Sequence, residues 1–211
     1  GIPVGNTPGC LNASTADMTM ALLMASARNI VVGDHYARSP EFVHYDPAIL
    51  IGQEVTGSTL GIVGMVRIGK EVAKRANAFD IRALYHNRRR DEAAEQTLGV
   101  EYRDLNDLLR ECDFVTLNCP LTRETTGMIG REQLEMMQPG AILINMARGP
   151  VVVTEDLYEV LKAGRIRGAG LDVTDPEPLE RDNPLLSLTN VVIAPHLGSA
   201  SNRTRQRMME M

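Results

Sequence analysis

The N-terminal part of the chain is predicted to form one long helix followed by an irregular loop. Residues 12–32 place apolar side chains at helical spacing, and Ser14 or Thr15 can cap this helix. The stretch 33–53 carries two prolines and scattered aromatic side chains, which are not typical of a regular element. Because long loops in compact domains are usually functional or make contacts elsewhere, we expect one of these roles for this loop.

From residue 58 onward, short apolar runs alternate with helix-like segments. Strands are predicted at 59–63, 81–85, 100–102, 114–118, 141–145, 170–173 and 191–194. Helices are predicted at 67–78, 91–98, 105–109, 131–137 and 154–161, with caps at Asp104 and Thr154 and an end at Gly164. This alternation predicts right-handed βαβ units and a parallel sheet. The expected fold is a Rossmann-type, doubly wound α/β domain preceded by a helix-and-loop arm.

The composition is that of an ordinary globular protein. Of the 211 residues, 44% are hydrophobic and 23% are charged. The 22 Lys and Arg against 27 Asp and Glu give a net charge of −5, which predicts no broad surface for nucleic acid or anionic membranes. The three cysteines fit neither a disulfide framework nor a zinc site, so we expect no metal and a cytoplasmic setting. No apolar stretch is long enough to span a bilayer.

The turn after the first predicted strand has the position of a dinucleotide-binding fingerprint. Gly64 would permit the tight turn, and Gly69 would permit close packing of the next helix on the sheet. Val66 replaces the middle glycine, and it should either push a diphosphate outward or force a backbone angle that a branched residue disfavours. A strand-to-helix turn without any ligand is the simpler alternative at this point.

The loop after the second predicted strand carries arginines where an NAD-binding domain usually carries an acid. Residues 87–91 read Asn-Arg-Arg-Arg-Asp, so the first acid is Asp91. A carboxylate would repel a 2′-phosphate, whereas guanidinium groups bind it in bidentate fashion. The sequence therefore favours NADP over NAD, with a solvated basic loop as the alternative.

Three chemically useful side chains stand just after predicted strands. Arg148, Glu177 and His196 follow the fifth, sixth and seventh strands. Ligands of open α/β sheets bind outside the carboxyl ends of the strands. Each residue alone has a simpler explanation, as an ion-paired arginine, a turn-shaping glutamate or a surface histidine. Three of them at the same edge indicate a site.

The chain resembles, nearly end to end, the D-isomer-specific 2-hydroxyacid dehydrogenases, and within them the glyoxylate and hydroxypyruvate reductases. The matching segments are 1–4, 61–69, 118–122, 144–149, 170–178 and 195–199. The resemblance implies that His196 donates and accepts the proton, that Glu177 is its partner, and that Arg148 anchors the substrate. An imidazolium is a natural proton donor to a carbonyl oxygen near neutral pH, and an arginine fork fits a planar carboxylate.

The resemblance also implies a bound coenzyme and a dimer. The expected coenzyme contacts are Gly64, Arg67, Ile68, Asn87, Arg88, Pro120, Met146, Asp172 and Gly198, with Asp172 on the nicotinamide carboxamide. Residues 1–53 resemble the family's dimerisation arm, so a homodimer is implied. Tyr45 stands where close relatives carry a tryptophan that reaches the neighbouring subunit's substrate, and ordinary interface packing is an equally open role for it.

The same resemblance divides the chain and indicates that part of the protein lies outside it. Residues 54–198 would form the NAD(P)-binding domain, and residues 199–211 would begin a C-terminal helix. The family's substrate domain has no counterpart in these residues, so we expect an incomplete active site. Two other functions stay open: a dinucleotide-sensing, catalytically weak interaction protein, which Val66 favours, and a methyltransferase-like domain, which has no need of Arg148, Glu177 and His196.

Overall fold

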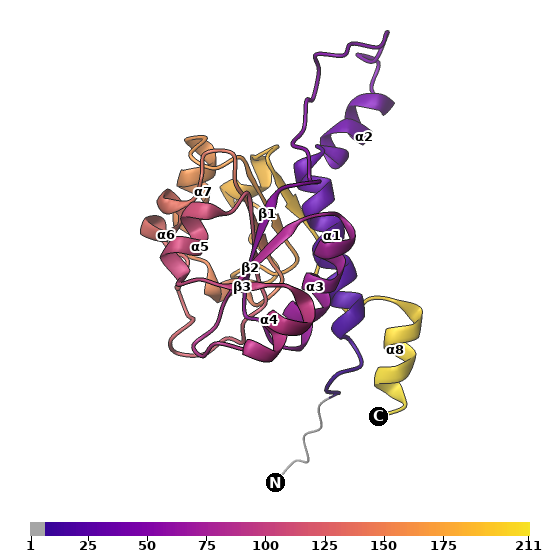
Figure 1. Cartoon of the computed structure of the whole chain (residues 1–211). Helices are drawn as coiled ribbons and strands as arrows, with labels where there is room; N and C mark the ends of the chain where they lie inside the picture. The colour runs from indigo at the N-terminus through magenta and orange to yellow at the C-terminus, as the bar shows by residue number, and fades with distance from the viewer. Residues whose placement is uncertain (1–6) are drawn as a thin grey trace.

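One parallel sheet organises the chain (Figure 1). The structure is a computed structural model that describes residues 7–211, so the matching segment 1–4 lies outside the described residues. The strands are β1 (Thr59–Val63), β2 (Arg82–His86), β3 (Glu101–Tyr102), β4 (Phe114–Leu117), β5 (Ile142–Asn145), β6 (Gly168–Leu171) and β7 (Val191–Ile193). Their order is β3-β2-β1-β4-β5-β6-β7, and every neighbouring pair is parallel. Successive strands are added outward from β1 to β3 on one side and from β4 to β7 on the other, so the strand order has a switch point between β1 and β4. The predicted doubly wound fold is confirmed.

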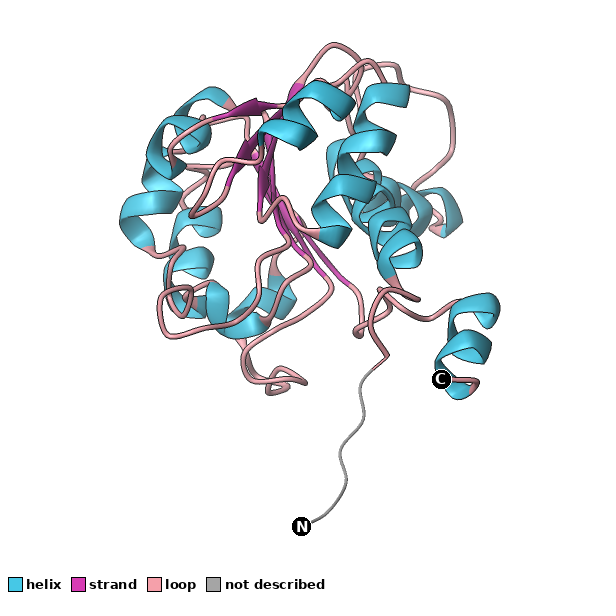
Figure 2. Cartoon of the chain, turned by 60° about the horizontal axis from the view of Figure 1, so that its bottom comes forward, coloured by secondary structure: helices cyan, strands magenta, loops and turns pink. Residues whose placement is uncertain are grey.

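Helices cover both faces of the sheet, as Figure 2 shows. The α-helices are α1 (Asn12–Ala27), α2 (Ile30–Arg38), α3 (Arg67–Ala78), α4 (Glu92–Leu98), α5 (Leu105–Glu111), α6 (Arg131–Met136), α7 (Thr154–Lys162) and α8 (Asn202–Met209). Two short 3₁₀ helices, η1 (Gly149–Val151) and η2 (Pro184–Ser187), lie in the connections after β5 and β6. Among residues 7–211, no helix is both long and apolar enough to cross a membrane.

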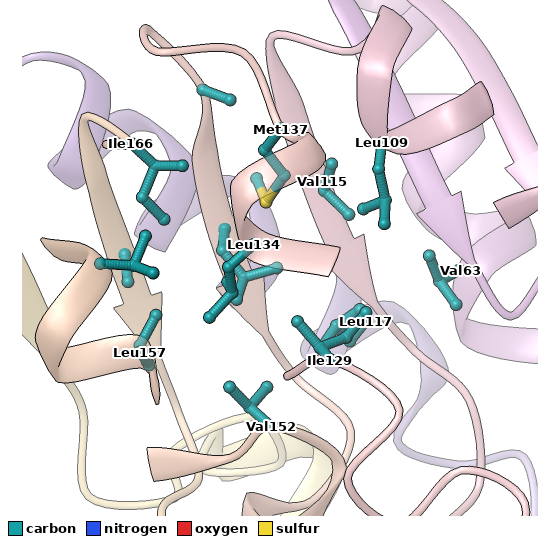
Figure 3. Close-up of a cluster of buried hydrophobic side chains, with 14 of the residues drawn as sticks. Val63, Leu109, Val115, Leu117, Ile129, Leu134, Met137, Val152, Leu157 and Ile166 are labelled. Atoms are coloured by element: carbon teal, nitrogen blue, oxygen red, sulfur yellow. The ribbon is translucent and has the colours of Figure 1, made fainter. Parts of the chain in front are cut away.

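The two faces of the sheet bury two separate apolar clusters. Helices α5, α6 and α7 pack on one face, where Leu109, Leu134 and Leu157 meet strand residues such as Val115 (Figure 3). Helices α1 and α3 pack on the other face. Every residue of β4, β5 and β6 is buried, since each of these strands is covered on both sides. This burial explains why their sequences show apolar runs instead of alternation.

The prediction of a single helix over 12–32 is wrong, because the helix is interrupted at Asn29. Helix α1 ends at Ala27, and Asn29 adopts a left-handed backbone with φ of 53° before α2 begins. Asparagine tolerates this conformation better than most residues. Its side-chain amide donates to Leu50 O at 3.1 Å, which ties the break to the returning loop. The loop therefore starts after Arg38 and not at residue 33.

The capping predictions fail where a side chain has a partner elsewhere. The N-cap of α1 is Leu11, while Ser14 Oγ donates to the carbonyl of Gly198 at 2.9 Å. Thr154 is the first residue of α7 and donates to Asp175 O at 2.9 Å. Asp104 stands at the N-cap of α5 but makes no capping bond.

Most other boundaries are within a residue or two of the prediction. Gly164, with φ of 65°, follows the end of α7 as expected. The sixth strand shows the largest shift, because it starts at Gly168 rather than Gly170. Glycine has a low strand propensity, so these positions carry no strand signal in the sequence.

Candidate coenzyme and catalytic site

The glycine turn between β1 and α3 has no room for side chains at two positions. Gly64 has φ of 103°, and a Cβ there would lie 2.6 Å from the backbone nitrogen of Cys119, in the loop after β4. A Cβ on Gly69 would overlap the carbonyl oxygen of Gly64 and lie 3.1 Å from Ile62 Cγ2. The turn is therefore as tight, and α3 as close to β1, as a dinucleotide-binding turn requires.

Val66 is accommodated without backbone strain, so one of the two consequences expected for it is wrong. It is the N-cap of α3 and has an extended backbone, with φ of −103° and ψ of −155°. A branched residue adopts this conformation readily. The side chain is 47% exposed and faces a hollow beside the turn. The other expected consequence, an outward displacement of a diphosphate by the side chain, stays a prediction.

Asn87 fixes the turn from the end of the neighbouring strand. Its Oδ1 accepts a hydrogen bond from Met65 N at 2.8 Å, and its Nδ2 donates to Met65 O at 3.3 Å. The carbonyl of His86 accepts from Gly64 N at 3.0 Å. Asn87 therefore shapes the glycine turn through both side-chain atoms, a structural role that the spacing along the sequence did not reveal.

A hollow of about 700 Å³ opens between the glycine turn and the arginine loop. We call it the basic hollow, and it is lined by Met65, Val66, Arg67, Lys70, Asn87, Arg89, Arg90, Asp91 and Glu92. Arg88, which was expected to contact the coenzyme, is exposed and lies outside this lining. Ile68, another expected contact, is half-buried in the first turn of α3.

Asp91 is already engaged by protein groups. One carboxylate oxygen accepts from Ala94 N at 3.0 Å and caps α4, and the other pairs with Lys70 Nζ at 2.7 Å. The Lys70 ammonium group, followed by the capping bond, lowers the pKa of Asp91. The first acid after β2 is therefore charged and occupied. The tight turn and the cationic side chains of the lining fit the diphosphate of a dinucleotide.

His196 and Glu177 meet beyond the carboxyl ends of β6 and β7. His196 Nδ1 lies 2.5 Å from Glu177 Oε1, and both side chains are a little under half exposed. His196 has a left-handed backbone with φ of 56°, and its amide donates to Asp172 O at 2.9 Å. Left-handed residues other than glycine are uncommon and concentrate at functional sites.

Asp172 holds the segment that carries His196. Its side chain is 3% exposed, Oδ1 accepts from Leu197 N at 2.6 Å, and Oδ2 accepts from Gly198 N at 2.8 Å. A Cβ on Gly198 would lie 3.0 Å from Asp172 Oδ2 and 3.4 Å from Met146 Cε. The sequence did not predict this clamp, because no local pattern links Asp172 to residues twenty-five and twenty-six positions further along the chain.

Arg148 lies at the same edge of the sheet as this pair. Register aligns Asn145, Leu171 and Ile193 across β5, β6 and β7, and Arg148 and His196 each follow their aligned residue by three positions. The loop between β6 and β7 packs tightly on the residues next to Arg148, since a Cβ on Gly149 would overlap the carbonyl oxygen of Thr174.

The structure does not join Arg148 to the histidine–glutamate pair. Arg148 is exposed and donates from Nη1 to Ala147 O at 2.6 Å. Within residues 7–211, no hydrogen bond or ion pair links it to Glu177 or His196. The guanidinium is therefore available to a ligand at this edge.

The remaining expected site residues lie in different surroundings. Met146 is buried at the end of β5, and Pro120 is exposed in the loop after β4. Tyr45 is 80% exposed on the loop 39–53, which projects beyond α2 at the top of Figure 1. No described hydrogen bond connects Tyr45 with His196, Glu177 or Arg148.

The sheet order and the tight glycine turn beside its switch point define the chain as a Rossmann-type NAD-binding domain. Residues 20–198 match the family described as "D-isomer specific 2-hydroxyacid dehydrogenase, NAD binding domain". The chain belongs to this family of 2-hydroxyacid dehydrogenases, as its sequence motifs indicated.

Known relatives agree with this assignment over the whole chain. The chain is 54% identical over 212 residues to a glyoxylate reductase from Korarchaeum cryptofilum, covering 100% of this chain and 64% of the relative. It superimposes on the TT0316 protein from Thermus thermophilus with a TM-score of 0.94 and 50% identity, covering 100% of this chain and 66% of that one. A glyoxylate reductase from Paecilomyes thermophila gives a TM-score of 0.89 at 33% identity, covering 100% of this chain and 62% of that one. The chain thus spans 64% of the length of the Korarchaeum relative.

Proposed function

We propose that this chain is the coenzyme-binding part of an NADPH-dependent reductase of small 2-oxo acids. Glyoxylate and hydroxypyruvate are the proposed substrates, and glycolate and D-glycerate are the products. The observation that carries the proposal is the contact between His196 and Glu177 at the carboxyl edge of the sheet. Similarity to glyoxylate reductases supports the choice of substrate.

His196 would move the proton. Reduction of a 2-oxo acid adds a hydride to the carbonyl carbon and a proton to the carbonyl oxygen, and a nicotinamide bound in the domain supplies the hydride. Because Glu177 engages Nδ1, the Nε2 atom of His196 is the nitrogen left to exchange a proton with the substrate. In the direction of oxidation, the neutral ring would accept the hydroxyl proton.

Arg148 would bind the substrate as an anion. Its guanidinium is exposed and makes only one described hydrogen bond, from Nη1 to Ala147 O. The other donors can form a bidentate contact with a planar carboxylate and polarise the neighbouring carbonyl group. This role keeps the substrate beside His196 without a direct contact between the two side chains.

The coenzyme would lie along the edge from the basic hollow to His196. Gly64 and Ile68 would hold the diphosphate, and the loop with Asn87 and Arg88 would flank the adenosine. Pro120, Met146, Asp172 and Gly198 are the proposed contacts for the nicotinamide half. The preference for NADPH is supported by Arg67 and Arg89, which line the hollow and form no ion pair among residues 7–211.

A homodimer through the N-terminal arm is the proposed assembly. Helix α2 buries none of its residues in this chain, and the loop that follows exposes large apolar side chains. The exposed residues are Val31 on α2 and, on the loop, Phe42, Val43, Tyr45, Ile49 and Ile51. Such a concentration of exposed apolar side chains is typical of an interaction surface, and Tyr45 would reach the neighbouring subunit's substrate.

The test uses a protein that also contains the expected substrate domain, and it follows the oxidation of NADPH and NADH with glyoxylate or hydroxypyruvate through the absorbance of the reduced coenzyme. His196→Asn and Glu177→Gln should each lower kcat by about 100-fold or more while the affinity for NADPH stays unchanged. Glu180→Gln, an exposed residue in the same connection as Glu177 that forms no ion pair among residues 7–211, is the matched control and should keep the wild-type rate. A wild-type rate for His196→Asn would refute the enzymatic role and favour a dinucleotide-binding interaction protein.

A further inference from the structure

A buried tyrosine and a glutamate hold the arginine loop, residues 87–91, in place. Tyr85 on β2 is fully buried, and its hydroxyl donates to Glu95 Oε1 at 2.7 Å while it accepts from Asp91 N at 2.7 Å. Burial raises the pKa of Tyr85 to about 12, so the hydroxyl keeps its proton near neutral pH. Through these two hydrogen bonds, Tyr85 connects the loop that follows β2 to α4.

The same glutamate binds one of the three arginines of this loop. Arg90 Nε donates to Glu95 Oε1 at 2.7 Å, and Arg90 Nη2 donates to Oε2 at 2.6 Å. The Glu95 side chain is only 17% exposed, and the Arg90 guanidinium, followed by the Tyr85 hydroxyl, lowers the pKa of Glu95. A bidentate pair of this kind is among the stronger contacts between charged side chains.

The charges around the basic hollow therefore divide into paired and unpaired groups. Arg90 is paired with Glu95, and Lys70 is paired with Asp91. Arg67 and Arg89 line the hollow and form no ion pair within the described part of the chain, and neither does the acid Glu92. A dianion that approached Arg90 would also approach the Glu95 carboxylate, which would offset the attraction.

We propose that Glu95 is a specificity-determining residue, which withholds Arg90 from the 2′-phosphate of the coenzyme and leaves Arg89 to bind that group. This inference rests on the proposed function, because it concerns how the chain distinguishes NADPH from NADH. It assigns different roles to three consecutive arginines that the sequence alone makes equivalent. Arg90 lines the hollow but is paired with Glu95, Arg89 lines the hollow and forms no ion pair in residues 7–211, and Arg88 lies outside the lining.

Two fragments of the coenzyme separate the 2′-phosphate from the rest of the molecule. Isothermal titration of the full chain with 2′,5′-ADP and with 5′-AMP measures this difference directly. Glu95→Gln keeps an oxygen acceptor for Tyr85 but removes the charge that holds Arg90. It should bind 2′,5′-ADP at least about threefold more tightly and leave the affinity for 5′-AMP within about twofold.

Glu132→Gln is the matched control for this substitution. It removes the same charge from α6, which packs on the opposite face of the sheet, and Glu132 is exposed, lies outside the lining of the basic hollow and pairs with no cation in residues 7–211. The affinities of Glu132→Gln for both fragments should stay within about twofold of wild type, as expected for a screened surface charge. An equal gain in Glu132→Gln would overturn the proposal, because net charge alone would then explain the effect.

Substitutions of the arginines complete the test. Arg89→Gln should weaken 2′,5′-ADP binding about tenfold, whereas Arg90→Gln should leave it within about twofold. In the Glu95→Gln background, Arg90→Gln should abolish the gain. If Arg90→Gln weakens binding as much as Arg89→Gln, or if Glu95→Gln gives no gain, Glu95 does not withhold Arg90.

The outcome also distinguishes this inference from the proposed function. Equal affinities of the wild type for 2′,5′-ADP and 5′-AMP refute the preference for NADP. The affinity gain in Glu95→Gln tests a separate claim, namely that Glu95 withholds Arg90. Thermal unfolding of each variant shows whether it folds. If Glu95→Gln does not fold, Arg90→Gln decides alone: unchanged discrimination between the fragments supports the proposal, and lost discrimination overturns it.

Discussion

Replacing Asp172 with asparagine should release the segment that carries His196. The carboxylate accepts backbone hydrogen bonds from Leu197 and Gly198, and the main-chain oxygen of Asp172 accepts the one from His196. An asparagine can accept only one of the two side-chain bonds. Its amide group would instead direct N–H bonds toward the other backbone N–H group.

The expected loss follows from the number and kind of these bonds. A hydrogen bond to a charged, buried group contributes about 1.5–3 kcal/mol, so losing one such bond and weakening the other should cost about 2–4 kcal/mol. The Asp172 side chain is only 3% exposed, so water cannot replace the lost partner. His196 holds a left-handed backbone at φ of 56°, and this conformation should relax when the clamp is lost.

Amide hydrogen exchange measures this release at the affected groups. In Asp172→Asn, the amides of Leu197 and Gly198 should exchange roughly 30- to 900-fold faster, which corresponds to the predicted energy. Asp175→Asn removes an exposed carboxylate from the same connection and should leave both rates unchanged. Wild-type exchange at Leu197 and Gly198 in the Asp172 variant would refute the clamp.

Two further predictions concern the glycine turn and an edge of the sheet. Val66→Gly should bind NADPH at least about threefold more tightly, since the side chain facing the hollow is removed. Titration by coenzyme fluorescence measures the two affinities, and equal values contradict the prediction. Arg82, followed by Arg103, lowers the pKa of Glu101 from 4.5 to about 2, so this carboxylate stabilises the fold above pH 4.5 and loses its contribution as the pH falls toward 2. Because Glu101 is 47% exposed, Glu101→Gln should cost only about 0.5–1 kcal/mol in urea unfolding at neutral pH. This cost should shrink in acid and at high salt, and a difference independent of pH would count against the pairing.

The repeating part of the fold could be predicted because its signals are local. The strand β1 and the helix α3 have the predicted bounds, since an apolar run, a glycine turn and an amphipathic segment follow one another directly. The break at Asn29 could not be predicted in this way. It depends on a contact with Leu50, which lies twenty-one residues further along the chain.

In the candidate site too, local signals predict the positions of residues, whereas contacts between residues distant in the sequence are not predicted. Strand ends mark where Arg148, Glu177 and His196 should lie, and the structure places the last two in contact. The functions of the supporting residues depend on partners that are distant in sequence. Asn87 accepts a hydrogen bond from the amide of Met65, and Asp172 accepts hydrogen bonds from the amides of Leu197 and Gly198. A single sequence shows where Asn87 and Asp172 stand but not which groups they hold.

Ser14 shows why a local rule can fail at a site. A serine near the start of a helix is usually read as a cap, yet Ser14 donates to the carbonyl of Gly198, a residue of the segment that Asp172 clamps. Helix α1 therefore contacts the candidate site near its first turn and leads to α2 near its last, about 24 Å away for sixteen residues. One helix thus connects the proposed dimer arm with the segment that holds His196. The residue that would have capped the helix makes this connection instead.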